Sequence, residues 1–122
     1  MSARLTTHSL DVAPLLAPIA KGDGKAVTDQ EIVERMMLPM LLECSRCLED
    51  KIVETPVEVD LALVYGLGFP PFRGGIFRWA DGLGAAALVD ATQKYTKLGK
   101  LYEPTAQLKD LAKTGKTFHV AG

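Results

Sequence analysis

Residues 28–48 read TDQEIVERMMLPMLLECSRCL and predict the longest helix of the chain. Thr28 followed by Glu31 is the signature of a capping box, in which each side chain accepts a hydrogen bond from a backbone N–H at the helix start. Behind this start, apolar side chains recur at spacings of three and four and cover more than one stripe. They are Ile32, Val33, Met36, Met37, Met40, Leu41, Cys44, Cys47 and Leu48. We therefore expect a central helix that is contacted from several sides.

The segment 55–65 is ambiguous between strand and helix. Its valines and leucines alternate with acidic residues and Ala62, as in a half-buried strand. Thr55, Pro56 and Glu58 instead match the cap, first and third positions of a helix with a second capping box. We interpret the segment as a helix, because no other segment offers a partner strand.

The remaining segments also predict helices. We expect one short helix within 11–20, a turn of helix over 76–80 that Asp81-Gly82 breaks, and an amphipathic helix through Leu88 and Leu98 that stops at Gly99. A last helix runs from about Pro104, as its first residue, to Thr114, with Gly115 behind it. The predicted fold is all-α, with about five helices around one core. Residues 1–27 are an N-terminal extension with a short helix and a linker, 28–118 the helical domain, and 119–122 a tail.

Composition favours one soluble domain. The chain has 122 residues, 48% of them hydrophobic and 24% charged, and its 14 basic and 15 acidic residues give a net charge of -1. Nucleic acid is therefore not expected as a partner. The sequence shows neither an apolar run of membrane-spanning length nor a signal region at its start, so we expect a cytoplasmic protein without a membrane span.

Cys44 and Cys47 have the spacing of a metal-binding or redox pair. A structural zinc site needs about four ligands, and the only other soft donors, His8 and His119, stand near the termini. A redox pair usually opens a helix, whereas this pair lies in the middle of one. We expect buried, unreactive thiols and no metal.

Several polar residues are candidates for chemistry or binding. Glu31 and Glu58 are explained as helix caps, and Glu43 is explained by an ion pair with Arg46. Glu34 and Asp60 remain unassigned, and we favour structural roles for both. Neither histidine has a neighbouring carboxylate in the sequence that would suggest a catalytic pair. The glycines around Phe69 and Phe72 match no complete phosphate-binding motif, and a tight turn that lets both rings reach the core explains them as well. Arg73 and Arg78 remain as possible anion or partner contacts.

The segment 34–81, ERMMLPMLLECSRCLEDKIVETPVEVDLALVYGLGFPPFRGGIFRWAD, resembles the C-terminal helical domain of 3-hydroxyacyl-CoA dehydrogenases. The version GFPPFRGG, with RWAD and LYEPTAQL after it, looks most like the second, terminal copy of that domain in the α subunit of bacterial fatty-acid oxidation complexes. The motif falls on Arg35, Pro39, Glu43, Leu48-Glu49, Asp60, Gly66, Gly68, Phe69, Pro70 and Asp81-Gly82-Leu83-Gly84. We expect the resembling residues Phe72, Arg73, Gly74, Gly75 and Arg78 to belong to the same structural or interface motif.

The resemblance implies a compact helical bundle of the kind found at the C-terminus of 6-phosphogluconate dehydrogenase. It also implies a parent enzyme that hydrates 2-enoyl-CoA and oxidises (3S)-3-hydroxyacyl-CoA with NAD. Catalytic copies of the domain carry asparagine where this chain has Glu34, and a carboxylate can only accept where an amide can donate. We therefore expect a structural domain without catalytic residues, cofactor or metal of its own. Its expected partners are the hydratase and NAD-binding domains of the parent chain and the thiolase subunit, with a homodimer possible for the isolated chain.

Two other interpretations remain open at this point. In the first, the chain is a stand-alone module that binds CoA through Arg73, Arg78 and nearby lysines, or that dimerises. In the second, it is a thiol-dependent or zinc protein that uses Cys44 and Cys47.

Overall fold

The computed structural model describes residues 11–22 and 25–120, and within these ranges all regular structure is helical. The α-helices are α1 (Ala13–Leu16), α2 (Asp29–Glu49), α3 (Pro56–Leu67), α4 (Ile76–Leu83), α5 (Ala85–Gln93) and α6 (Ala106–Thr114). Three short 3-10 turns join them: η1 (Pro71–Arg73), η2 (Thr96–Leu98) and η3 (Lys100–Tyr102). The predicted all-α fold is confirmed, with α2 to α6 around one core. None of these helices has the length and apolar character needed to cross a membrane.

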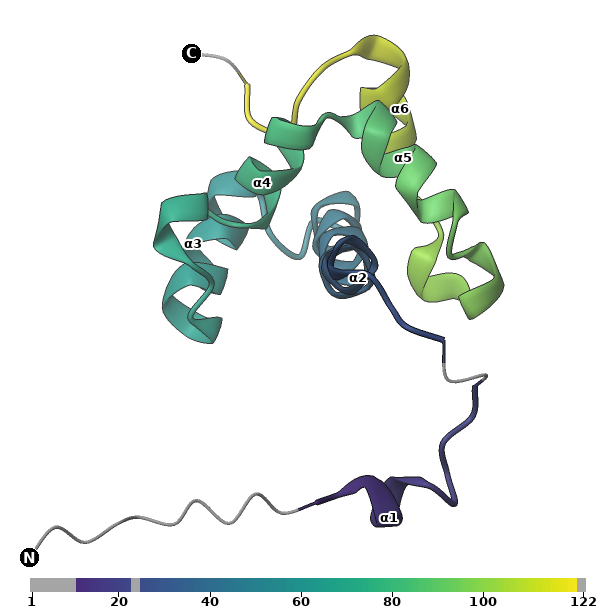
Figure 1. The fold of residues 1–122 in the computed structure, drawn as a ribbon. Coiled ribbons are helices and arrows are strands. Elements are labelled where there is room, and N and C mark those ends of the chain that lie inside the picture. Colours follow the sequence, from purple (N-terminus) through teal and green to yellow (C-terminus); the bar gives the residue numbers. More distant parts are fainter. Residues whose placement is uncertain (1–10, 23–24, 121–122) are drawn as a thin grey trace, which may run out of the picture.

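Helix α2 lies at the centre of the bundle. Figure 1 shows it nearly end-on, with α3 and α4 on one side and α5 and α6 on the other, and it contacts α4, α5, α6 and η3. Its buried face carries Leu38, Leu41 and Leu42. The central position is confirmed, but Ile32, Val33 and Met36 are exposed, because no described segment covers that side of the first turns.

Local hydrogen bonds set the starts of the two longest helices. Thr28 Oγ1 accepts from the Glu31 N–H at 3.2 Å, and Glu31 Oε2 accepts from the Thr28 N–H at 2.9 Å, so the capping box is complete. Thr55 accepts from the Glu58 N–H, which confirms a helix rather than a strand. The second box is only half formed, because the Glu58 carboxylate accepts from the N–H of Glu54 instead of Thr55.

Helix α2 continues through Pro39, and a tyrosine satisfies the carbonyl that this proline leaves without its usual partner. Proline has no N–H to donate to the carbonyl four residues earlier, which belongs to Arg35. The Tyr102 hydroxyl donates to the Arg35 carbonyl oxygen at 3.3 Å. η3 is thereby fastened to the middle of α2.

Three helix boundaries differ from the prediction. Helix α4 does not break at Asp81-Gly82 but runs to Leu83 and ends at Gly84, which has a φ of 88°. Helix α5 ends at Gln93, and a 3-10 turn follows before Gly99. Helix α6 begins after Thr105, whose hydroxyl accepts from the Leu108 N–H, so Pro104 precedes the cap instead of opening the helix.

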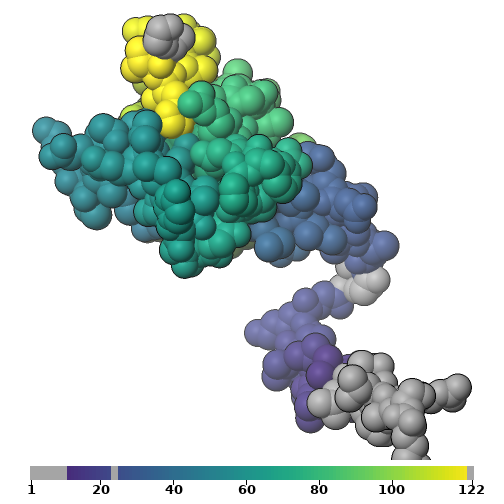
Figure 2. All heavy atoms as spheres, turned by 90° about the vertical axis from the view of Figure 1, so that its left-hand side faces the viewer, coloured from purple at the N-terminus to yellow at the C-terminus, as the bar shows by residue number. Residues whose placement is uncertain are grey.

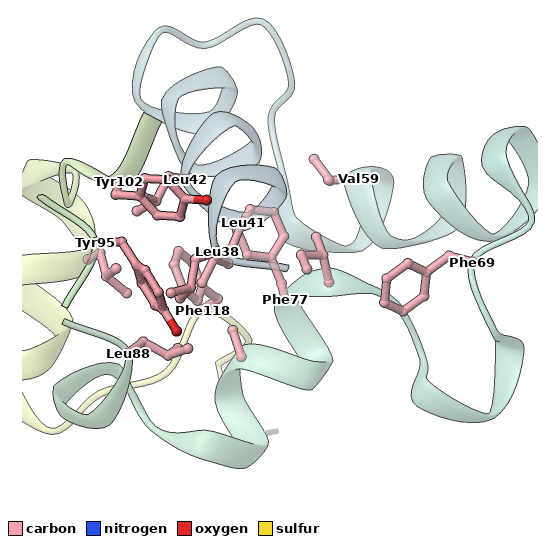
Figure 3. Packing of buried hydrophobic residues seen from close by; sticks show 13 residues of the cluster. Leu38, Leu41, Leu42, Val59, Phe69, Phe77, Leu88, Tyr95, Tyr102 and Phe118 are labelled. Atoms are coloured by element: carbon pink, nitrogen blue, oxygen red, sulfur yellow. The ribbon is translucent and has the colours of Figure 1, made fainter. Parts of the chain in front are cut away.

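The core joins α2 to the C-terminal half of the chain (Figure 3). The rings of Phe77 and Phe118 lie 4.5 Å apart, and those of Tyr95 and Tyr102 lie 5.3 Å apart. The Asp81 carboxylate accepts from the backbone N–H of Phe118 at 2.7 Å and of His119 at 3.0 Å. These bonds hold the segment after α6 against α4 and place Phe118 in the core.

The N-terminal segment does not take part in this core. Every residue from 11 to 22 is exposed, including those of α1, and Figure 2 shows the segment apart from the body of the domain. The predicted short helix is confirmed at Ala13–Leu16. Residues 1–10, which are part of the predicted extension, lie outside the described residues.

Candidate functional site

Glu34 is the centre of a polar cluster between α2 and the end of α5. Its side chain is only 11% exposed. The Tyr95 hydroxyl donates to Oε2 at 2.6 Å, Gln30 Nε2 donates to Oε1 at 2.8 Å, and Lys94 Nζ lies 3.1 Å from Oε1. Gln30 stands one turn earlier on α2, whereas Lys94 and Tyr95 follow α5 directly. The carboxylate is therefore buried with three donors of its own chain.

The hydrogen bonds of this cluster favour the charged form of Glu34. The bonds from Gln30 and Tyr95 lower the pKa of the carboxyl below its ordinary value of 4.5, against the opposing effect of burial. The bond to Glu34 raises the pKa of Tyr95 to about 12, with burial adding to the shift. Since the folded state prefers the carboxylate, the cluster stabilises the fold fully above the ordinary carboxyl pKa and less as the pH falls below it.

A hollow of about 500 Å³ opens beside Glu34, between α2, α4 and α5. This volume is in the range of small-molecule pockets. Its wall is largely apolar, with polar groups at Gln30, Glu34, Arg73, Asp90 and Lys94. Glu34 would be a weak base at neutral pH, because its pKa is lowered and its oxygens already accept hydrogen bonds from three side chains. The arrangement suits binding or packing better than proton transfer.

Asp60 provides the cap that α4 lacks locally. The residue before this helix is Gly75, which has no side chain to accept the first N–H groups. Asp60 on α3 accepts from the Phe77 N–H at 2.8 Å and from the Arg78 N–H at 3.1 Å. His119 Nε2 lies 2.8 Å from the same carboxylate. This histidine thus has a carboxylate neighbour in space, 59 positions away in sequence, and the Asp60 carboxylate caps helix α4.

The GFPPFRGG segment forms the turn from α3 to α4. Gly68, with a φ of 70°, ends α3, Gly66 lies in its last turn, and Gly74 and Gly75 have φ values of 73° and 105°. Phe69 is buried as expected, but Phe72 is 83% exposed, so the prediction that both rings reach the core is wrong. Phe72 lies in η1 on the outer side of this turn, where the Arg73 guanidinium stacks 5.3 Å from its ring centroid. Pro70 and Arg78 are exposed as well.

The other motif residues lie away from this turn. Arg35 has an exposed side chain and contributes its carbonyl to the bond with Tyr102. Glu43 forms the predicted ion pair with Arg46 at 3.0 Å. Arg46 also donates to the carbonyl oxygens of Lys100 and Glu103, so the pair helps to fix η3 on α2.

The two cysteines behave as packed thiols. Both are free and partly buried. Burial, and to a smaller degree Cys47, raise the pKa of the Cys44 thiol to about 11, which leaves little thiolate at neutral pH. In the part of the chain that the structure describes, no three of the His, Cys, Asp and Glu residues gather as a metal site would require.

Sequence reasoning missed the partners of Glu34 and Asp60. Gln30 stands four residues before Glu34, a helical spacing that brings two side chains together, so this partner could have been found. Lys94, Tyr95 and His119 come from about 60 positions away and carry no local signal.

The Glu34–Tyr95 bond predicts an unusual tyrosine titration. Of the three tyrosines in the chain, Tyr95 should ionise near pH 12, because its phenol is hydrogen-bonded to a carboxylate. Ultraviolet absorbance at 295 nm, followed against pH, measures this ionisation. In a Glu34→Gln variant the ionisation of Tyr95 should move to lower pH, since the neutral amide no longer opposes a phenolate. An identical curve for both proteins would contradict the bond.

Comparison with known proteins places the chain in a family. A model of the 3-hydroxyacyl-CoA dehydrogenase C-terminal domain matches residues 32–120. The chain is 52% identical over 104 residues to the fatty acid oxidation complex subunit alpha of Pseudomonas paraeruginosa, which covers 85% of this chain and 14% of that protein. It is 50% identical over 107 residues to the same subunit of Ectopseudomonas oleovorans, covering 88% of this chain and 15% of the relative. The chain therefore belongs to the 3-hydroxyacyl-CoA dehydrogenase C-terminal domain family, and it spans about a seventh of the length of these relatives.

Proposed function

We propose that this chain is the C-terminal structural and interaction domain of a fatty-acid β-oxidation enzyme and contributes no catalytic group to it. The parent chain hydrates 2-enoyl-CoA and oxidises (3S)-3-hydroxyacyl-CoA with NAD, which its other domains bind. This proposal is supported by the sequence identity of 52% and 50% to two fatty acid oxidation complex α subunits. The matched segment is only about a seventh of the length of these subunits.

The main support for a non-catalytic role is the charge and the hydrogen bonding of Glu34. The family resemblance puts an asparagine of catalytic copies at this position. Here the side chain is a carboxylate that cannot donate a hydrogen bond. It already accepts hydrogen bonds from Gln30, Lys94 and Tyr95. The residue thus fastens α5 to α2 and has no donor to offer a substrate carbonyl.

The same proposal defines the partners and the cellular setting. The hydratase and NAD-binding domains of the parent chain are the direct partners, and a thiolase subunit is the partner of the assembled complex. The enzyme works in the cytoplasm. A homodimer of the isolated chain would form only through surfaces that the parent covers.

A chimera tests the proposal. The segment of the Pseudomonas paraeruginosa subunit that matches this chain is replaced by the residues of this chain. The hydratase and NAD-dependent dehydrogenase rates of this chimera are compared with those of the natural subunit and of a subunit without the segment. We expect the chimera to keep both activities and the shortened subunit to lose stability or activity. The isolated chain should reduce no NAD with a 3-hydroxyacyl-CoA. An inactive, misassembled chimera, or turnover by the isolated chain, would refute the proposal.

A further inference from the structure

Three hollows of the surface meet at the same two side chains. Arg73 and Trp79 line the hollow beside Glu34, a second hollow of about 270 Å³ against the first turns of α2, and a third beside Phe72 and Arg78. The three hollows are therefore neighbours around Arg73 on η1 and Trp79 on α4. Together they form a broad and uneven surface around Arg73, with Lys94 in the first hollow and Arg78 in the third.

The surface around Arg73 is rich in exposed apolar side chains. Ile32 and Val33 are close to half exposed, Met36 is 68% exposed, and Phe72 is 83% exposed. We call the surface of Ile32, Val33, Met36, Phe72, Arg73 and Trp79 the Arg73 face. Tryptophan, phenylalanine, methionine and arginine are enriched at protein interfaces, and arginine and tryptophan often dominate their binding energy.

The charge around Arg73 is one-sided in two of the three hollows, since the carboxylates of Glu34 and Asp90 line only the first. The second and third hollows are lined by Arg73 and Arg78 and by no carboxylate, although the whole chain has a net charge of -1. Among the described residues, Arg73 makes no ion pair and stacks only on the exposed ring of Phe72. A guanidinium on an apolar surface matches a carboxylate with two hydrogen bonds.

The loop that carries Arg73 is held in one shape before any partner arrives. Gly75 packs directly against Asp60, whose carboxylate accepts from the N–H groups of Phe77 and Arg78. Phe69 anchors the other end of the loop in the core. A preformed surface loses little conformational entropy on binding, which favours a specific contact.

We propose that the Arg73 face docks on an earlier domain of the parent polypeptide, onto a surface that presents aliphatic or aromatic side chains beside a carboxylate that pairs with Arg73. This inference rests on the proposed function, and the length of the relatives outside the matched segment provides such domains. A second copy of this chain fits less well, because a two-fold contact centred on Arg73 would bring the two Arg73 guanidinium groups together. Residues 11–22 lie exposed and apart from the domain body in the structure.

Hydroxyl-radical labelling read by mass spectrometry tests which face is covered. The chain alone, at a concentration where it is monomeric, is compared with the chimera described above. Phe72 and Tyr65 are a matched pair, because both are aromatic and are 83% and 85% exposed. We expect labelling of Phe72 and Met36 to fall at least about fivefold in the chimera, as in a buried interface core, while Tyr65 on α3 stays labelled.

Each outcome of the labelling decides the inference. An active chimera in which Phe72 remains fully labelled overturns the docking face and leaves the proposed function intact, whereas an inactive chimera overturns the proposed function itself. Protection of Phe72 in the isolated chain that grows with concentration identifies a second copy as the occupant. Protection that is independent of concentration and disappears when residues 1–27 are removed identifies the N-terminal segment. Either result contradicts the proposal.

A charge reversal at Arg73 tests whether this residue pairs with a carboxylate of the partner domain. Arg73→Glu should restore the labelling of Phe72 in the chimera to nearly the rate of the isolated chain, because loss of a central arginine weakens such contacts by about 30-fold or more. The isolated variant should melt within about 2 °C of the unchanged chain, since the side chain is exposed. Lys109→Glu on α6, the same reversal at another exposed position, should leave the labelling unchanged. Equal labelling in both variants would overturn the role of Arg73.

Discussion

Replacing Asp60 with alanine is expected to lower the free energy of unfolding by about 4 kcal/mol, a large part of the stability of a domain this size. The carboxylate accepts from the N–H groups of Phe77 and Arg78 and contacts the ring of His119. Alanine leaves the buried N–H of Phe77 and the partly buried N–H of Arg78 without this acceptor, and each such loss costs about 1–3 kcal/mol. Helix α4 would also lose its only side-chain cap within the described residues, because Gly75 precedes it.

Urea denaturation followed by far-ultraviolet circular dichroism measures this loss. Asp60→Asn should be about half as damaging, since an amide oxygen can still accept one of the two N–H bonds. Asp110→Ala, which removes an exposed carboxylate on α6, should change stability by less than about 0.5 kcal/mol. Equal unfolding midpoints for Asp60→Ala and Asp110→Ala would contradict the capping role.

Features that depend on neighbours in sequence were predictable. The box of Thr28 and Glu31 and the cap at Thr55 need only residues three positions apart, and both fix helix starts in the structure. The same reasoning correctly favoured a helix for 55–65, where alternation of apolar residues indicated a strand, and the structure has α3 at Pro56–Leu67. Side-chain pairs three or four positions apart distinguish a helix from a strand in such segments, and these pairs can be recognised in a single sequence.

Features that depend on distant residues were not predictable. Asp81-Gly82 looked like a helix break, but the helix continues, and the Asp81 carboxylate instead accepts from the N–H groups of Phe118 and His119. The exposure of Phe72 follows from the path of η1 over α4, which no local spacing encodes. Of the candidate residues, Glu34 and Asp60 were identified, but half of their six hydrogen-bond partners, Lys94, Tyr95 and His119, lie about 60 positions away.

These distant contacts explain how short helices form a stable domain, because each contact fixes one short helix to a neighbouring element. Helices α4, α5 and α6 have eight or nine residues each, and isolated helices of that length are marginal in water. Each is tied to a neighbour by a polar side chain: α4 by Asp60, the end of α5 by Glu34, and α6 by the bond between Ser45 and Thr105. The buried polar groups therefore fix the positions of these helices, and the apolar core provides most of the stabilisation.

The close contact between Gly75 and Asp60 leads to the second large effect. Gly75→Ala should destabilise the domain by at least about 4 kcal/mol, because a Cβ there would overlap the Cβ, Cγ and Oδ1 atoms of Asp60 and the backbone has a φ of 105°. Gly68→Ala separates these causes, since Gly68 also has a positive φ of 70° but open space around its Cβ position. Its cost should be only the backbone strain, about 1 kcal/mol.

Unfolding midpoints in urea for the two variants, measured beside the unchanged chain, distinguish steric overlap from backbone strain. We expect Gly68→Ala to remain folded with a slightly lower midpoint, and Gly75→Ala to unfold at a much lower urea concentration or to be unfolded without urea. Because an alanine at 75 would push Asp60 away from the N–H groups of Phe77 and Arg78, Gly75→Ala and Asp60→Ala should cost less together than the sum of their separate effects. Additive losses in the double variant would show that the two residues act independently, and the packing of the loop against α3 would then need another explanation.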